Sequence, residues 1–249
     1  MNSELIEANA ARALFEHARG GVAGEAGGAI CTAVPALASV TMINRATPVE
    51  DDVDLHAVEA FFEPLGVRYA VAVTPQRDAL ARELEARGYE RGYAWAKFTQ
   101  PAREPAPAET DLRVEELGRD DGDALDLVVR EAYGMPDVVA GFLASAVGAP
   151  NLHCFVAWAG DEPAAAGAVY VEGGFAWFGV AGTRERFRRR GGQNAIVAAR
   201  LRRARELGAH TLVTETGELV PERPSSSYRN ILRAGFRQEY VRANWLSPQ

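Results

Sequence analysis

The chain has 249 residues, of which 47% are hydrophobic and 24% charged, and its formal net charge is −7. This composition is typical of a globular protein with one large or two modest domains, and its acidity disfavours non-specific binding of nucleic acid. No run approaches the ~18 apolar residues of a membrane helix, and the acidic start at residues 1–7 is unlike a signal peptide, so we expect a cytoplasmic protein without a membrane partner.

The cysteines and histidines indicate neither a disulfide nor a metal centre. Cys31 and Cys154 are the only cysteines, lie far apart, and are flanked by apolar or small residues. We therefore expect two buried thiols. The four histidines have no metal-ligand spacing with cysteine or acidic residues, so we predict no metal ion.

A proline-rich stretch at residues 101–111 divides the chain. Its prolines favour extended backbone and it has no hydrophobic period, as is typical of a linker. The sequence thus predicts an N-terminal domain at 1–100 and a C-terminal domain at 112–249.

Hydrophobic periodicity predicts an alternation of helices and strands in both segments. In the first, Leu65-Gly66 precedes an apolar strand at 67–74, and Gly88-Tyr89 precedes a strand that ends at Phe98. In the second, we predict helices from an N-cap at Asp120 or Asp121 through Ala132 and at 136–147, 195–207 and 226–233. The predicted strands there are 112–117, 152–159, 164–171, 175–181, 210–214 and 237–245. This order predicts an α/β fold, a mixed sheet flanked by helices.

Part of the pattern occurs twice. A glycine and three aromatic residues recur at identical spacing, as Gly88, Tyr89, Tyr93, Phe98 and as Gly235, Phe236, Tyr240, Trp245. The order helix, glycine, strand, helix, glycine-aromatic turn, strand is also repeated, which predicts an internal duplication.

An arginine cluster followed by two glycines, at residues 187–194, lies between the strand 175–181 and the helix 195–207. Glycines allow close approach of the backbone, and the start of a helix directs unpaired N–H groups and a positive dipole end at a ligand. The turn therefore predicts a site for phosphate or pyrophosphate. The first copy carries the acidic segment 43–52 instead, so only the second copy is expected to bind this ligand.

The C-terminal segment, over residues 112–246, resembles the GNAT superfamily of acyl-CoA-dependent N-acyltransferases. The family's CoA-binding pattern is Gln or Arg, Gly, any residue, Gly, any residue, then Gly or Ala. Residues 188–193 match it at the first arginine and the central glycine, while Arg189 replaces a glycine and Gln193 the final small residue. The N-terminal segment resembles a degenerate half of the same fold, giving a pseudo-duplicated arrangement.

The resemblance implies acetyl-CoA as co-substrate and a set of residues that bind it. The strand before the turn would pair with the pantetheine arm, and the fourth helix would supply one further contact. The implied residues are Ala181, Thr183, Arg188, Arg189, Arg190, Gly191, Gly192, Gln193, Asn194 and Asn230. Arg184 and Arg186 are either contacts to the CoA 3′-phosphate or solvated side chains.

The sequence offers one candidate for the general acid and one for the general base. In many relatives the general acid is a tyrosine four residues before the glycine of the Gly-Phe turn, and this chain has Ile231 at that position. Tyr228, one helical turn earlier, is the substitute candidate for the acid, or else a packing residue. Glu215 is the candidate base, or else a solvated acid at a strand end, and a chain of water molecules is a further alternative.

The function expected from this resemblance is an N-acetyltransferase acting on a primary amine of a small molecule or peptide. The alternative is a catalytically silent acyl-CoA sensor, motivated by Ile231 and by the lack of a carboxylate in the strand 175–181. A third reading, an arginine patch for nucleic acid, is opposed by the overall acidity. The chain could be a monomer or a homodimer.

Overall fold

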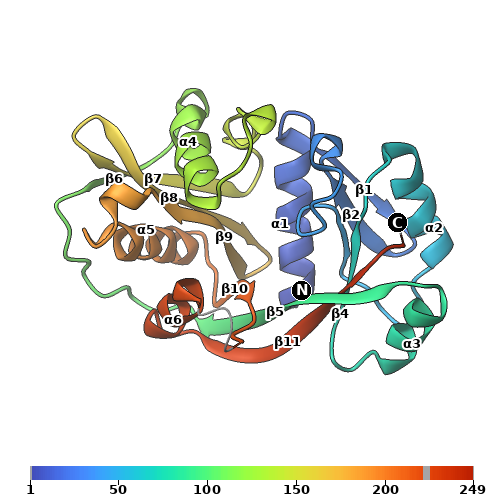
Figure 1. Ribbon diagram of the computed structural model, residues 1–249. Helices are drawn as coiled ribbons and strands as arrows, with labels where there is room; N and C mark the ends of the chain where they lie inside the picture. Colours follow the sequence, from blue (N-terminus) through green and yellow to red (C-terminus); the bar gives the residue numbers. More distant parts are fainter. Residues whose placement is uncertain (1, 221–224, 249) are drawn as a thin grey trace.

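The computed structural model describes residues 2–220 and 225–248, which form one mixed α/β structure (Figure 1). Its helices are α1 (Ser3–His17), α2 (Leu55–Phe62), α3 (Asp78–Ala86), α4 (Gly122–Tyr133), α5 (Gly192–Glu206) and α6 (Ser226–Arg233). Its strands are β1 (Val22–Ala26), β2 (Ala29–Ala33), β3 (Arg45–Thr47), β4 (Ala70–Val73), β5 (Glu90–Pro101), β6 (Arg113–Glu116), β7 (Leu152–Ala159), β8 (Glu162–Glu172), β9 (Phe175–Thr183), β10 (Thr211–Gly217) and β11 (Arg237–Leu246). The predicted α/β class is confirmed. Within the described ranges, none of these helices combines the length and apolar character needed to cross a bilayer.

The described strands belong to one sheet in the order β1-β2-β3-β4-β11-β5-β10-β9-β8-β7-β6. The pairs β3–β4 and β9–β10 are parallel, and α2 and α5 supply the crossovers that parallel pairs require. The series β3-α2-β4-α3-β5 therefore repeats as β9-α5-β10-α6-β11. Gly88 and Gly235 lie in the turns just before the last strand of each series and have φ of 83° and 93°, a region that favours glycine.

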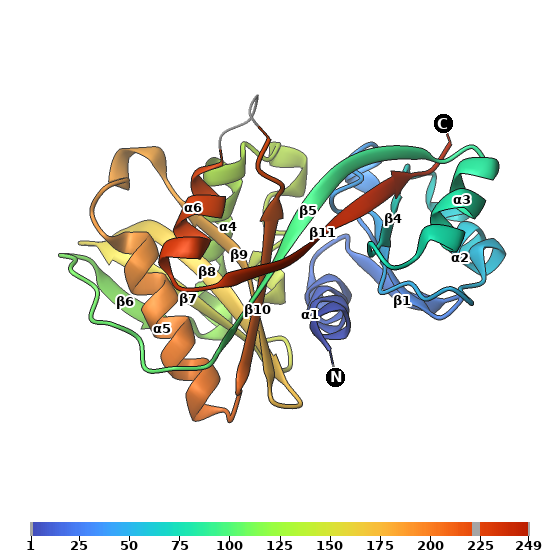
Figure 2. The ribbon, with the colours of Figure 1, turned by 90° about the horizontal axis from the view of Figure 1, so that it is seen from below.

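The last strands of the two series are exchanged in the sheet. β11 pairs with β4 of the first series, and β5 pairs with β10 of the second, while β5 and β11 also pair with each other. Figure 2 shows these two strands running together across the middle of the molecule. Side chains on β5 therefore lie next to β10, although residues 97 and 215 are far apart in sequence.

Helix α1 lies between the two ends of the sheet (Figure 1). Asn2 caps it by accepting hydrogen bonds from the backbone N–H groups of Glu4 and Leu5. Ile6, Ala10 and Leu14 lie at helical spacing and pack with residues of α4 and of β7 to β10 in one hydrophobic core. This packing fixes the rotation of α1, so that Glu4 and Glu7 are also buried against the sheet.

The prediction of a helix at 136–147 is wrong. The structure has two short 3-10 turns there, Asp137–Val139 and Ala144–Ala146. The carboxylate of the buried Asp126 accepts hydrogen bonds from the N–H groups of Gly141 and Leu143, at 3.0 and 3.1 Å. These donors are satisfied by a side chain from α4 rather than by helical carbonyls, so the segment folds around Asp126.

The two cysteines are buried free thiols, as predicted. They lie in different parts of the sheet, Cys31 on β2 and Cys154 on β7.

Candidate active site

A cavity of about 630 Å³ opens where β9 and β10 separate. The parallel pairing of these strands ends at Phe178 and Thr214, and the Thr214 hydroxyl donates to the Phe178 carbonyl oxygen at 2.8 Å. Beyond this point β9 has a bulge, because the pairing to β8 shifts between Gly179 and Gly182 and Val180 has a φ of 49°. On the edge away from β8, the backbone of β9 past Phe178 therefore faces the cavity instead of β10.

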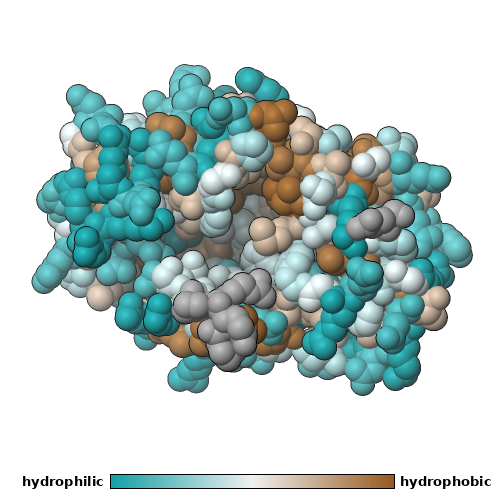
Figure 3. All heavy atoms as spheres, in the orientation of Figure 1, coloured by the Kyte–Doolittle hydropathy of each residue, from teal (hydrophilic) through white to brown (hydrophobic). Residues whose placement is uncertain are grey.

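The cavity reaches both faces of the sheet through this opening. On one face it is lined by residues of α5 and α6, including Val197 and Ile231. On the other face it is lined by Tyr133 of α4 and by Arg45 and Trp95 of the N-terminal segment. Figure 3 shows a hollow near the centre of the molecular face seen in Figure 1. A ligand bound on one side could thus meet a ligand bound on the other side at the strand opening.

Four of the residues implied to bind the co-substrate line this cavity: Ala181, Gln193, Asn194 and Asn230. The Asn230 side-chain amide donates to Gln193 Oε1 at 2.8 Å and so links α6 to the first turn of α5. The carbonyl oxygen of Ala181 accepts a hydrogen bond from the Tyr133 hydroxyl at 2.8 Å. These four residues therefore lie at the cavity, and their role in binding the co-substrate stays a prediction.

The other implied residues, Thr183, Arg188, Arg189, Arg190, Gly191 and Gly192, lie outside the cavity lining. Gly191 is the N-cap of α5 with a φ of 77°, and a Cβ there would overlap the carbonyl oxygen of Glu109 in the connecting segment. A Cβ on Gly192 would lie 2.9 Å from Leu112 Cδ1. The two glycines therefore allow residues 109–112 to pack closely against the start of α5.

Most arginines around the turn are engaged with carboxylates. Arg190 pairs with Asp111 and Arg186 with Glu162. Arg184 is buried, and its guanidinium makes a bidentate pair with Glu131 of α4 at 2.7 and 2.9 Å. Arg184 is therefore neither a solvated side chain nor a free contact for a phosphate, because it is buried and its guanidinium is bound to Glu131. The pair connects the end of β9 to α4.

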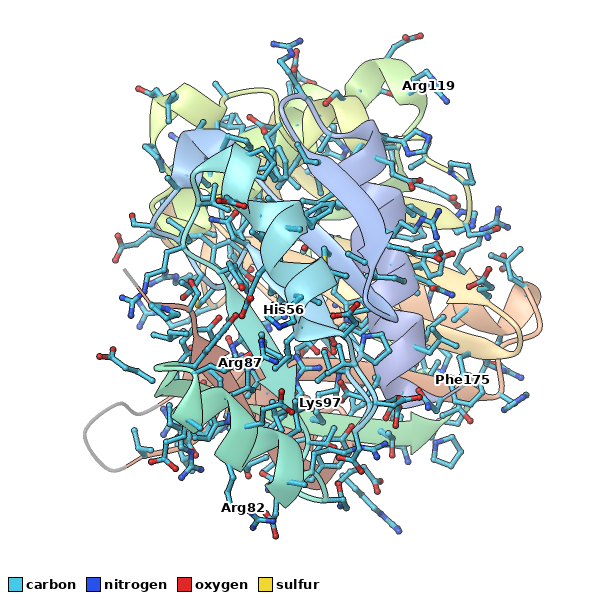
Figure 4. The ribbon with its side chains drawn as sticks, turned by 90° about the vertical axis from the view of Figure 1, so that its right-hand side faces the viewer. His56, Arg82, Arg87, Lys97, Arg119 and Phe175 are labelled. Atoms are coloured by element: carbon cyan, nitrogen blue, oxygen red, sulfur yellow. The ribbon has the colours of Figure 1, made fainter. Side chains whose placement is uncertain are left out.

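Glu215, the candidate base, lines the cavity and belongs to a buried charge cluster. Lys97 Nζ of β5 donates to Glu215 Oε2 at 2.7 Å and also pairs with Glu7 of α1. Arg45 lies 2.8 Å from Glu7 and 3.8 Å from Glu215. Arg242 of β11 bonds Glu7 at 2.8 and 2.9 Å and Glu4 at 2.5 Å. Figure 4 labels Lys97, which lies inside the molecule, whereas Arg82 projects from its edge.

This cluster separates the pKa values of its two central carboxyl groups. Burial raises the pKa of Glu215 to about 7, and the negative charge of Glu7 adds to the rise while Lys97 and Arg45 oppose it. Burial would raise the pKa of Glu7 as well, but Arg242, Lys97 and Arg45 together hold it well below its usual value. Glu215 is thus the carboxyl group of this pair that can exchange a proton near neutral pH.

The Tyr228 hydroxyl does not reach the cavity. It donates to Gln238 Oε1 of β11 at 2.5 Å, and the ring packs edge-on against Phe98 with centroids 5.1 Å apart. Within the described residues, the tyrosines that line the cavity are Tyr93 and Tyr133, whose hydroxyls donate to backbone oxygens of Thr41 and Ala181.

Sequence reasoning missed Glu7, Arg45, Lys97, Tyr133 and Arg200 at the cavity or in the charge cluster. One signal was present, because Lys97 is the only lysine of the chain and lies in a largely apolar strand. A lysine in such a place needs a buried carboxylate partner. The identity of that partner depends on strand order, which the local pattern does not contain.

No protein-family model matches this sequence, and a comparison with curated protein sequences finds no match. Solved structures do match over almost the whole chain. A GCN5-related N-acetyltransferase from Kribbella flavida is 16% identical with a TM-score of 0.65, covering 98% of this chain and 95% of its own. A tandem GNAT protein from the clavulanic acid biosynthesis pathway is 15% identical with a TM-score of 0.63, covering 93% and 85%. A functionally unknown conserved protein from Staphylococcus epidermidis is 10% identical with a TM-score of 0.60, covering 90% and 92%. The chain has the fold of the GCN5-related N-acetyltransferases, in an arrangement that matches a tandem member.

Proposed function

We propose that the protein is an acyl-CoA-dependent N-acyltransferase that transfers an acyl group, in the simplest case acetyl, to a primary amine of a small molecule or peptide. The observation that carries this proposal is Glu215, a carboxyl group with a pKa of about 7 at a strand opening accessible from both faces of the sheet. The fold supports the same reaction class, because the matched structures include N-acetyltransferases.

The α5 and α6 side of the cavity fits a CoA thioester. The first turn of α5 offers backbone N–H groups and the positive end of a 15-residue helix to a pyrophosphate, beside Gln193 and Asn194. The β9 backbone past Phe178 offers groups that β10 leaves unpaired, and the Ala181 carbonyl oxygen is an acceptor for an amide of the pantetheine arm. When the pantetheine arm binds, the Tyr133 hydroxyl would either donate to the same Ala181 oxygen as the pantetheine amide or give up its hydrogen bond to that oxygen.

The opposite side of the opening fits the amine. An ammonium group near Glu215 is attracted by the ionised carboxylate and loses a proton to it, which produces the nucleophilic amine. The amine nitrogen then attacks the thioester carbon, the carbon–sulfur bond breaks, and the proton that the nitrogen loses passes to the sulfur, so that CoA leaves as the thiol. Lys97 and Arg45 stabilise the ionised form of Glu215 before proton transfer. The exposed backbone of the β9 bulge could polarise the thioester carbonyl.

We also propose that the chain consists of two related halves, residues 1–100 and 112–249, of which only the second binds the thioester. In the first half, the loop that corresponds to the arginine turn holds Glu50 and Asp51, both paired with Arg77. The first half contributes Arg45, Trp95 and Lys97 to the site in the second half, so neither half would be active alone.

The proposal is tested by measuring free thiol release from acetyl-CoA over a panel of primary amines, together with calorimetric titration by CoA. We expect CoA binding, and thiol release that depends on the amine and is lost in Glu215→Gln but kept in Glu85→Gln, a change at an exposed acid on α3. Tight binding without turnover on any amine would favour the sensor. Absence of CoA binding would overturn the proposal.

A further inference from the structure

Arg200 is a buried cation at the cavity that the proposed mechanism does not use. It lies on α5 with 4% of its surface exposed, and its side chain lines the cavity. The guanidinium carbon is 4.8 Å from the centroid of the Phe178 ring. Nη1 donates to the carbonyl oxygens of Ala168 at 3.2 Å and Gly179 at 3.4 Å, so the group lies at the point where β9 and β10 separate.

Arg200 differs from the other buried cations of the described chain. Arg45, Lys97, Arg184 and Arg242 each form an ion pair with at least one carboxylate. Among the residues that the structure describes, no carboxylate lies within 4.0 Å of the Arg200 guanidinium, and its side-chain hydrogen bonds go to backbone oxygens. These oxygens satisfy N–H groups but leave the positive charge without a counter-charge, which is costly in a buried place.

The surroundings of Arg200 are shaped to hold it. Gly167 of β8 lies against the guanidinium, and a Cβ there would lie 3.1 Å from Arg200 Cζ and 2.8 Å from Ile196 Cγ2. Burial lowers the pKa of Arg200 to about 10, so the group remains charged at neutral pH. Of the three carbonyl groups that it bonds, those of Ala168 and Gly179 flank the β9 bulge, so the guanidinium is held in a fixed position beside the proposed thioester site.

The phosphates of CoA are poorly placed to supply the missing negative charge. A pyrophosphate at the first turn of α5 would lie near Gly192, eight residues before Arg200, which corresponds to about 12 Å along the helix. Arg200 instead lies next to Gly179, where the acyl end of the thioester would be.

We propose that the preferred acyl donor is a CoA monothioester of a short dicarboxylic acid, whose distal carboxylate binds Arg200. This inference rests on the proposed function and names the donor class of the same site. In the transfer step, Glu215 first takes the proton of the ammonium group, and the free amine then forms the carbon–nitrogen bond as the carbon–sulfur bond breaks. The second proton that the nitrogen loses passes to the leaving sulfur, so CoA leaves as the thiol. The distal carboxylate is unchanged and only anchors the acyl chain.

The inference can be tested by binding alone, without knowledge of the amine. Two unreactive thioethers, S-(3-carboxypropyl)-CoA and S-butyl-CoA, place a carboxylate or a methyl group at the end of similar chains. Calorimetric titration should show that the carboxylate form binds at least about tenfold more tightly, as a charge-assisted hydrogen bond in a buried site would give. Arg200→Gln should remove this preference, Arg200→Lys should keep part of it, and Arg202→Gln, at an exposed position of the same helix, should leave it unchanged.

Equal affinity of the two thioethers for the unchanged protein would overturn the inference, and this comparison does not depend on any variant folding. A preference that survives in Arg200→Gln would also overturn it, provided that thermal melting shows the variant to be folded. CoA itself serves as the reference ligand. If CoA binds but the thioethers are not distinguished, the donor class is wrong and the proposed function stands, whereas failure of CoA to bind would remove both.

Discussion

Lys97 Nζ lies 2.7 Å from Glu215 Oε2, although the Lys97 side chain is fully buried and that of Glu215 is 5% exposed. The two residues face each other across the antiparallel pair of β5 and β10, in direct register. One comes from the N-terminal segment and the other from the C-terminal segment, so the exchanged strands bring together the group that is proposed to accept the proton and the cation that stabilises its ionised form.

Replacing the proposed base should remove activity while leaving the binding site intact. We expect Glu215→Gln to lower the turnover number by about 10²- to 10⁴-fold, the range typical of general base catalysis. Its affinity for CoA should stay within about threefold of the original, because Glu215 is on the amine side of the opening. Steady-state thiol release and calorimetry measure the two quantities, and a variant with unchanged turnover would exclude Glu215 as the base.

The activity should rise with pH through the pKa of Glu215. Its carboxyl group must be ionised to accept a proton, so kcat/KM should increase with an apparent pKa of about 7. Lys97→Met removes the cation that favours the ionised form, so the midpoint should move to higher pH. Profiles recorded with one amine for both proteins test this, and a midpoint that does not move would show that Lys97 has no influence on the catalytic group.

The same substitution should destabilise the fold. Lys97→Met leaves the buried charges of Glu7 and Glu215 with fewer partners, and loss of one member of a buried pair typically costs about 3–5 kcal/mol. The double change Lys97→Met with Glu215→Gln should recover part of this loss, because one of the unpaired carboxylates is then neutral. Urea unfolding of the single and double variants gives the free energies, and strict additivity would contradict a direct interaction.

Stability should depend on pH through Glu7 and Glu215 with opposite signs. The pKa of Glu7 is depressed in the folded protein, so its contribution is complete above its ordinary value of 4.5 and is lost as the pH falls below that value. The pKa of Glu215 is raised, so ionising it costs stability as the pH rises from about 4.5 through about 7. Glu7→Gln should therefore flatten the acid side of the stability profile and Glu215→Gln the neutral side. The reverse pattern would contradict the assignment.

Gly191 should be less tolerant of substitution than Gly208, although both have positive φ, 77° and 82°. A Cβ on Gly208 meets nothing within 4 Å, so Gly208→Ala should cost only the backbone strain of about 1–2 kcal/mol. A Cβ on Gly191 overlaps the Glu109 carbonyl oxygen, so Gly191→Ala should cost about 1–3 kcal/mol more. Thermal melting of the two variants decides this, and equal losses would mean that residues 109–112 can move away.

Local sequence patterns predicted most of the elements around the site. The predicted helix at 226–233 coincides with α6, and the predicted strand at 152–159 coincides with β7, because periodicity and flanking glycines act within a few residues. The helix predicted at 136–147 failed because its N–H groups bond to the carboxylate of Asp126, a partner from another helix. The resemblance led to Gln193 in the motif, to Asn194 directly after it and to Asn230 in the fourth helix, and all three line the cavity. The motif also included Gly191 and Gly192, which lie against the connecting segment, and in the case of Gly192 also against Ala165 of β8.

The sequence by itself determined the class of fold, the repeated order of its elements and the buried state of the cysteines. These features depend on hydrophobic periodicity and on residues that are close in the chain. Only the tertiary structure decided that β5 and β11 are exchanged, and therefore that Glu7, Lys97 and Glu215 share one buried cluster. The protonation of a buried carboxyl group depends on charges within a few ångströms, and here those charges come from segments up to about two hundred residues apart.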